Sequence, residues 1–230
     1  MTRTEITGVP GVPETALSDE LLARLPDNLA PAPWECRFSG LVWSGRGGKA
    51  AQAALPARLR HARALATVGG FVRYEDTPVG PYDEVFGQVA SHEGRKPWGS
   101  VTFMAVDSEA SLVGGRTNWS MPKTLASFDG EIGPKKTIAG WSEGPVRWRV
   151  EATPVAVGPR VTRGTSAQVR QEFADGVVRP CLMTGRGTMR PALIRVEVVS
   201  DGPLASWLRP GLHAGAVIES GTFSLSDPLA

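Results

Sequence analysis

The sequence predicts a mainly β protein built as one domain, and three observations support this prediction. Short segments rich in β-branched and aromatic residues recur from residue 34 onward, separated by glycines and Gly-Pro pairs. Such segments at even spacing are typical of a β-sandwich or a β-barrel. They do not alternate with helices as the β-α-β units of a parallel sheet would. A chain of 230 residues, 41% of them hydrophobic, can bury the sizeable core of one larger domain.

Residues 1–33 contain five prolines and are predicted to form an N-terminal arm without an independent core. Ser18 is suited to cap a short helix with Asp19 and Glu20 in its first turn. We expect this arm to pack on the domain of residues 34–230 or on a neighbouring subunit.

The remaining elements follow from local composition. The predicted strands cover residues 34–43, 71–74, 85–89, 101–106, 127–132, 137–141, 146–157, 193–199 and 216–225. Alanine-rich residues 49–66 predict a helix that Pro56 breaks, which leaves a second helix carrying Leu59, Ala62 and Leu65. A further short helix is predicted over residues 108–113, with Asp107 as its N-cap and Gly114 past its end, and another over residues 165–173.

Charge and cysteine content narrow the function classes. The net charge of +2 is nearly balanced, so it gives no support for a nucleic-acid or membrane-surface partner. Cys36 and Cys181 are too few for a disulfide framework, which favours a reducing compartment. No apolar run is long enough for a membrane span, and the N-terminus lacks the pattern of a signal peptide. We therefore expect a cytoplasmic protein.

Motifs for metals and cofactors are missing from the sequence. The three histidines, His61, His92 and His213, lack metal-ligand spacing, and there is no Cys-x-x-Cys pair. Residues 44–49 are glycine-rich but depart from the phosphate-loop pattern, so a turn is the better interpretation. These observations predict neither a metal nor a cofactor.

Lys123 is the candidate reactive residue. It follows Pro122, whose ring fixes φ and pushes Met121 toward an extended conformation, so the backbone here is stiff. Trp119 and Met121 could place the lysine against an apolar wall. Burial favours the neutral amine, which is a nucleophile toward carbonyl carbon. Most lysines, however, are solvated surface residues, and composition alone leaves Lys123 among them.

Two motifs suggest a family. Gly115-Arg116 is followed by five residues and then Pro122-Lys123, a run that resembles the signature of the acetoacetate decarboxylase family, in which the lysine forms a Schiff base. Upstream, residues 80–84 (Gly-Pro-Tyr-Asp-Glu) are similar to the family's G-x-Y-x-E segment. The resemblance extends weakly from about Trp34 to the C-terminal end.

The resemblance implies a closed antiparallel β-barrel of the acetoacetate decarboxylase type with flanking short helices, in a homo-oligomer. It implies that Lys123 is the nucleophile and Glu84 the acid/base, without a cofactor, on a small keto-acid substrate. Tyr82 would also contact the substrate, and Trp119 and Met121 would line it.

Arg116 could bind a substrate carboxylate bidentately or make a structural bond from the turn.

The chain departs from the family pattern at several positions. Thr124 stands where the decarboxylases have a second lysine, and Thr117 where they have a glutamate. Arg37 is no secure counterpart of their N-terminal active-site arginine. Glu75 resembles a second family acid, but its spacing to Glu84 is shorter.

Two functions remain open. The chain could be a Schiff-base lyase that decarboxylates a keto acid or catalyses related aldol or dehydration chemistry. Alternatively, it could be a non-catalytic member of the family that binds a small ligand or serves as a structural subunit.

Overall fold

The computed structural model describes residues 3–94 and 96–229, and its dominant feature is a highly curved sheet. The strands are β1 (Trp34–Arg46), β2 (Ala66–Asp76), β3 (Tyr82–Glu93), β4 (Lys96–Val106), β5 (Lys123–Gly130), β6 (Ile138–Ser142), β7 (Trp148–Val157), β8 (Val161–Glu172), β9 (Val178–Ser200) and β10 (Gly211–Leu225). The helices are α1 (Arg3–Thr7), α2 (Asp19–Arg24), α3 (Lys49–Ala54), α4 (Glu109–Trp119) and α5 (Leu204–Trp207), with 3-10 turns at Pro13–Thr15 and Ala57–Leu59. The predicted mainly β class is confirmed.

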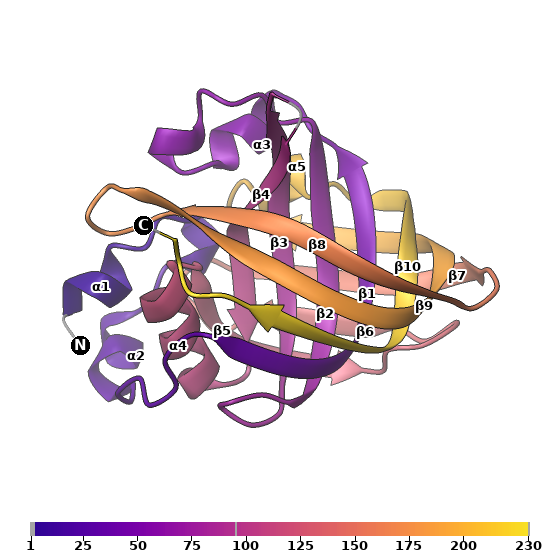
Figure 1. Ribbon diagram of the computed structural model, residues 1–230, viewed down its shortest axis with the longest axis horizontal. Coiled ribbons are helices and arrows are strands. Elements are labelled where there is room, and N and C mark those ends of the chain that lie inside the picture. Colours follow the sequence, from indigo (N-terminus) through magenta and orange to yellow (C-terminus); the bar gives the residue numbers. More distant parts are fainter. Residues whose placement is uncertain (1–2, 95, 230) are drawn as a thin grey trace.

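The strand order explains how the sheet closes. Neighbours follow the order β10-β1-β2-β3-β4-β5-β6-β7-β9-β8, and β9 also pairs with β10 while β8 pairs with β4. The strands therefore form a ring that β8 and the first half of β9 cross diagonally (Figure 1). Most pairings are antiparallel, as predicted, but β4 runs parallel to both β5 and β8, so the ring is not a regular antiparallel barrel.

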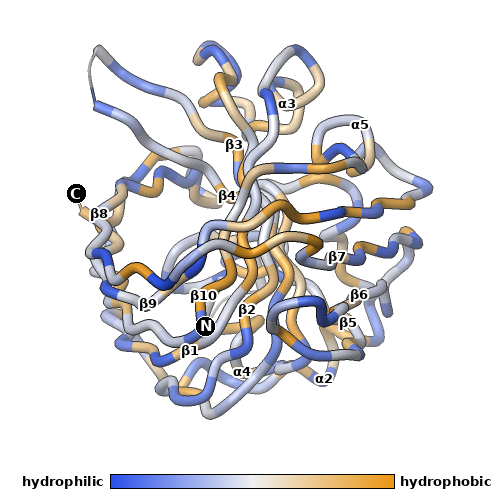
Figure 2. Tube along the Cα trace, turned by 90° about the vertical axis from the view of Figure 1, so that its right-hand side faces the viewer, coloured by the Kyte–Doolittle hydropathy of each residue, from blue (hydrophilic) through white to orange (hydrophobic). Residues whose placement is uncertain are grey.

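Strands β2, β3 and β4 are buried on both faces. On one face Phe71, Val85 and Phe103 belong to a packed core shared with β6, β7 and the second half of β9. On the other face Val72, Tyr74 and Met104 belong to a second cluster with α4 and the first part of β1. Because successive side chains of a strand point to opposite faces, three strands serve two interiors. Hydrophobic residues accordingly follow these strands through the centre of the molecule (Figure 2).

One predicted helix was wrong, and a second prediction was confirmed only in part. Residues 165–173, predicted as a helix, lie mostly in strand β8, which pairs with β9 from Val161–Met189 to Glu172–Val178. The many bonds to β9 outweigh a local preference that is weak in this segment. In residues 49–66, α3 ends at Ala54 before Pro56, as the predicted break requires. The second helix is reduced to the 3-10 turn at Ala57–Leu59, and strand β2 begins at Ala66.

Helix α4 starts and ends later than predicted. Ser108, rather than Asp107, caps it by accepting a hydrogen bond from the Ser111 amide. The Asp107 carboxylate instead accepts a hydrogen bond from the Asp83 amide of β3. The helix continues through Gly114 to Trp119. A side chain at position 114 would lie 2.5 Å from the Trp34 ring, so glycine here permits close packing rather than ending the helix.

The N-terminal arm contacts the rest of the chain through buried polar groups. Ser18 caps α2, as predicted, through the Leu21 amide. Glu14 is 1% exposed, and its Oε1 accepts hydrogen bonds from the Ser200 hydroxyl and the Leu204 amide. These bonds connect the arm to the end of β9 and the start of α5.

No helix among residues 3–94 and 96–229 combines the length and hydrophobicity that crossing a membrane requires.

Candidate active site

Lys123 lies where the chain leaves α4 and enters the sheet. Ser120 ends the helix in the left-handed conformation, with φ of 53°, and its amide donates to the Arg116 carbonyl. Pro122 then leads into β5, where Lys123 is in parallel register with Met104 of β4. The lysine is thus held on the sheet between β4 and α4, and its side chain is 4% exposed.

The Lys123 amine has three polar partners. Its Nζ lies 2.9 Å from Oε2 of Glu84, whose side chain is 3% exposed. It donates to the Ser111 hydroxyl at 2.8 Å and to the Tyr82 hydroxyl at 3.4 Å. The Tyr82 ring centroid is 5.0 Å from Nζ. The structure therefore brings together Lys123, Glu84 and Tyr82, as the motifs had suggested, and adds Ser111.

Glu84 is held by strand pairing and by a second tyrosine. It faces Val72 of β2 and Val106 of β4 across the sheet. Its Oε1 accepts a hydrogen bond from the Tyr74 hydroxyl at 3.2 Å. Burial, together with the negative charge of Glu84, raises the pKa of Tyr74 well above its usual value, and that of Tyr82 likewise. Both phenols therefore remain protonated and can donate hydrogen bonds at neutral pH.

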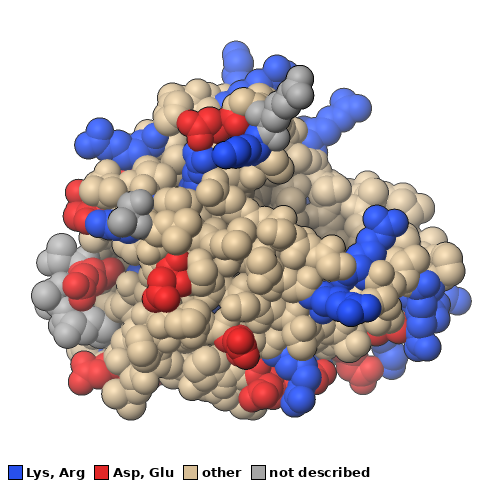
Figure 3. Space-filling view, viewed as in Figure 1, with Lys and Arg blue, Asp and Glu red and all other residues tan. Residues whose placement is uncertain are grey.

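The Lys123–Glu84 pair lies at the buried end of a cavity of about 500 Å³. Trp119 and Met121, the predicted apolar wall, line it beside Lys123. Toward the other end the lining residues become exposed, with Arg163 and Thr165 of β8 at the opening. The face crossed by β8 and β9 carries few charged side chains at its centre and is hollowed beside β8 (Figure 3).

Helix α4 fits closely over the lysine because of a glycine. A side chain at Gly115 would lie 2.5 Å from Cδ and 2.6 Å from Cε of Lys123. Any larger residue would have to displace the lysine or the helix. The glycine of the Gly-Arg pair thus permits the lysine to lie along the helix surface.

Arg116 lies outside the cavity lining and contacts backbone. Its Nε donates to the Lys123 carbonyl at 2.6 Å, and its Nη1 and Nη2 donate to the carbonyls of Ile6 and Thr15 at 2.8 and 2.7 Å. Burial lowers the pKa of this guanidinium, while the three carbonyl acceptors favour its charged form. Of the two roles considered for Arg116, the geometry matches the structural bond.

Sequence reasoning missed several residues of the site. Ser111 and Tyr74 belong to no recognisable motif, and only the fold brings them to Lys123 and Glu84. Cys36 lines the cavity, and burial raises its thiol pKa to about 12. Glu75 and Arg37, by contrast, pair with each other at 3.3 Å with about half of each side chain exposed.

Within the described part of the chain, no group of three or more histidine, cysteine, aspartate or glutamate side chains could hold a metal ion.

The curved ring of strands, with its few short helices, has the acetoacetate decarboxylase-like fold. The family model for acetoacetate decarboxylase matches residues 47–158, which include Glu84 and Lys123. The match covers just under half of the chain, and it is consistent with a divergent member of the acetoacetate decarboxylase family. No curated protein matches the sequence.

Solved structures share the fold at low identity. The enduracididine biosynthesis enzyme MppR complexed with pyruvate has a TM-score of 0.61 and 14% identity, over 87% of this chain and 91% of that one. MppR has also been solved with the condensation product of pyruvate and imidazole 4-carboxaldehyde. Acetoacetate decarboxylase from Legionella pneumophila gives 0.55 and 15%, over 89% and 90%. An acetoacetate decarboxylase-like enzyme from Sphingomonas wittichii gives 0.57 and 16%, over 89% and 94%.

Proposed function

We propose that this protein is a Schiff-base lyase that condenses Lys123 with a small keto acid and then catalyses decarboxylation or related aldol or dehydration chemistry. One observation carries the proposal: a buried amine lies 2.9 Å from a buried carboxylate at the closed end of a cavity. An amine is a nucleophile only without its proton, and here the carboxylate that can take this proton is in contact. The family and the ligands of MppR support a keto acid as substrate.

The chemistry begins with proton transfer from the Lys123 ammonium to Glu84. The Nζ lone pair attacks the carbonyl carbon, and the carbonyl oxygen takes the proton from Glu84. Glu84 then accepts a proton from the nitrogen of the carbinolamine and donates it to the hydroxyl, which leaves as water. The products are an iminium ion, ionised Glu84 and one water molecule, so charge and protons balance.

The iminium ion withdraws electrons from the adjacent carbon and so permits two outcomes. In a 3-keto acid, the electron pair of the bond to the carboxylate moves into the iminium as CO₂ leaves, giving an enamine. Alternatively, Glu84 takes a proton from the adjacent carbon, and the resulting enamine attacks an aldehyde. In the first route a proton from solvent adds to the enamine carbon and restores the iminium ion, and in the second Glu84 returns its proton to the oxygen of the aldehyde. In both routes water then hydrolyses the iminium ion and restores the amine. The condensation product found in MppR supports retaining the second route.

A non-catalytic, ligand-binding role is the second candidate, and the contacts of Nζ favour it. Ser111, Tyr82 and Glu84 offer three acceptors, which match the three donors of an ammonium group. An amine held in this way would bind a ligand through its charge and would not attack it.

Borohydride trapping separates the two candidates. The protein is incubated with pyruvate or acetoacetate, reduced with sodium borohydride, and its intact mass and peptides are measured. A lyase gives one adduct, located on Lys123, that is absent from Lys123→Ala and at least a hundredfold slower to form in Glu84→Gln.

The matched control is Lys136→Ala, because Lys136 is also paired with a glutamate, Glu131 at 3.0 Å, but is largely exposed. It should leave the adduct unchanged. Ligand binding that survives in Lys123→Ala without any trapped adduct would instead establish the non-catalytic role.

A further inference from the structure

The cavity is too long and too apolar for a small keto acid alone. Glu84, Phe86 and Gln88 alternate along one face of β3 and all line it. Four residues of extended strand span about 13 Å, so the cavity continues well past the reactive pair. A cavity of about 500 Å³ is in the range that holds drug-sized ligands.

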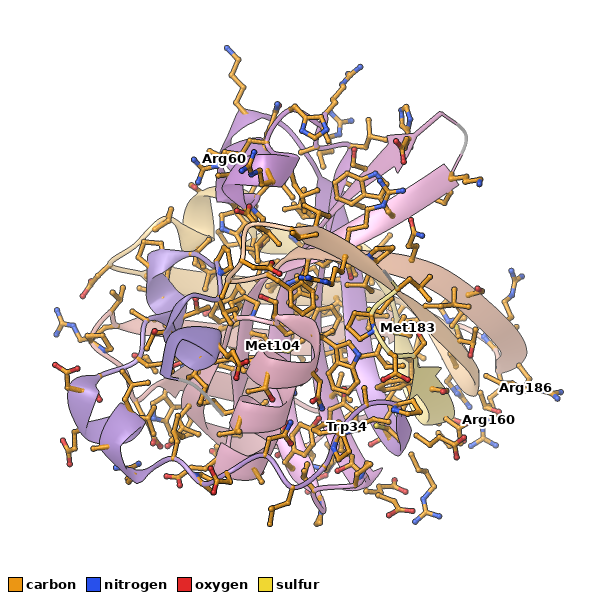
Figure 4. All side chains as sticks on the ribbon, turned by 60° about the vertical axis from the view of Figure 1, so that its left-hand side comes forward. Trp34, Arg60, Met104, Arg160, Met183 and Arg186 are labelled. Carbon is orange, nitrogen blue, oxygen red and sulfur yellow. The ribbon has the colours of Figure 1, made fainter. Side chains whose placement is uncertain are left out.

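Burial gives the cavity a direction. Lys123, Glu84 and Tyr82 are buried, Phe86 and Met183 are half-buried, and Arg163 and Thr165 are exposed. A ligand whose carbonyl reaches Nζ must therefore direct its other substituent toward the opening beside β8. Met183 lies among the interior side chains, whereas Arg160 and Arg186 project outward near the start of β8 (Figure 4).

The walls along this path are mostly hydrocarbon, aromatic and thioether groups, and Gln88 and Thr222 are among the few polar side chains. The apolar groups include Phe86 of β3, Met104 of β4, Met183 of β9, and Ile218 and Phe223 of β10. Water in such a space finds few polar partners, which buried water normally requires. An apolar substituent that fills it would bind with a gain of about fourfold per methylene, equivalent to about 0.8 kcal/mol.

We infer that the ligand is a carbonyl compound with an extended apolar substituent, an alkyl chain or an aryl group, that lies along β3 toward β8. This inference rests on the proposed function for the orientation of the carbonyl, and it extends the substrate class from small keto acids to apolar-chain ketones and keto acids. Lys123 binds the carbonyl group of the ligand, and the methionine and phenylalanine side chains of the wall select ligands with an apolar substituent.

A homologous series of methyl ketones tests the inference: butanone, 2-hexanone, 2-octanone and 2-decanone, each trapped on Lys123 with borohydride. The half-saturating concentration should fall about fourfold per methylene until the chain fills the cavity. The matching 2-alkanols cannot form imines. Their binding, followed by the fluorescence of Trp34 and Trp119 in the cavity wall, should show the same dependence.

Substitutions on β8 test where the alkyl chain of the ligand lies. Ala167 lines the cavity, whereas its neighbour Ser166 is exposed and lies outside the lining. Ala167→Phe should remove most of the preference for 2-decanone over butanone, while Ser166→Phe should leave both adducts unchanged.

The outcomes distinguish this inference from the proposed function. Alkanol affinity that rises with chain length, without any ketone adduct, would support the apolar-chain ligand and overturn the Schiff-base proposal. Adducts at Lys123 whose formation is independent of chain length would overturn the inference and leave the Schiff-base proposal standing.

Discussion

At the scale of single residues, the reactivity of Lys123 depends on groups that face the cavity. The missing second lysine of the family pattern is a smaller change than the sequence suggests. Residues 123 and 124 are successive positions of β5, so their side chains point to opposite faces. Thr124 therefore faces away from the cavity that Lys123 enters, and its neighbours include Gly144. Glu84, Ser111 and Tyr82 are the polar groups that contact the amine.

The thiols provide a test of burial at the same scale. Burial raises the pKa of both Cys36 and Cys181 from 9.0 to about 12, so each thiol stays protonated in the folded protein at pH 8. Only a thiolate reacts quickly with disulfide reagents. Modification by Ellman's reagent at pH 8 should be at least a hundredfold slower in the native protein than in guanidinium chloride.

The raised pKa values of the two thiols also determine how the stability of the fold depends on pH. Because each thiol has a higher pKa in the folded protein than in the unfolded chain, its contribution to the free energy of unfolding is fully present below about pH 9. That contribution is lost as the pH rises toward 12. Equal labelling rates for native and denatured protein would contradict the burial of the two thiols.

At the scale of elements, helix α4 positions the site. It supplies the Ser111 hydroxyl to Nζ, the close approach at Gly115 and the Arg116 guanidinium that binds the Lys123 carbonyl. Its cap, Ser108, fixes where the helix starts. One helix of three turns thus positions the side chain of Lys123, its backbone and one hydrogen-bond partner of its amine.

Gly115→Ala tests this role of α4. Alanine is the better helix former, by about 1 kcal/mol, so helix formation alone would favour the variant. The added methyl group would instead lie 2.5 Å from Lys123 Cδ and displace the side chain. We expect borohydride trapping at Lys123 to fall at least tenfold.

Ala110→Ser, at an exposed position of the same helix, should retain full trapping. Unchanged trapping in a folded Gly115→Ala variant would show that the close contact has no functional consequence.

At the scale of the whole molecule, buried polar residues join distant parts of the chain. Arg116 connects two carbonyls of the N-terminal arm, those of Ile6 and Thr15, to the backbone of Lys123. Gln171 connects β8 to β4: it donates to the Val101 carbonyl and accepts from the Val101 amide. These two side chains help to place the arm and β8 around the cavity.

Arg116→Met should therefore lower the free energy of unfolding by about 3 kcal/mol, because it leaves three buried carbonyls without donors. The arm should also become sensitive to thermolysin. Guanidinium denaturation and limited proteolysis measure the two effects.

Arg24→Met is the matched control. Arg24 also connects the arm to α4, through Glu109, but about half of its side chain is exposed, and such pairs contribute at most about 1 kcal/mol. Equal losses in the two variants would contradict the special role of Arg116.

Some parts of this molecule could be predicted from the sequence, and others could not. Strand-rich segments and glycine punctuation indicated the mainly β class, and two short motifs indicated Lys123 and Glu84. Strand β8 was missed because its pairing with β9, rather than local composition, determines it. Ser111 and Tyr74 were missed because they lie 12 and 10 residues from the groups they contact and reach them only through tertiary packing.

The two-sided burial of β2 and β3 separates their residues into even-numbered and odd-numbered sets. Even-numbered positions such as Val72, Glu84 and Phe86 meet the ligand space, whereas odd-numbered positions such as Phe71 and Val85 hold the packed interior. Substrate range can therefore diversify at one set of positions while the other set maintains thermal stability. An engineer could recode alternate codons of these two strands and change what the protein accepts without rebuilding its scaffold.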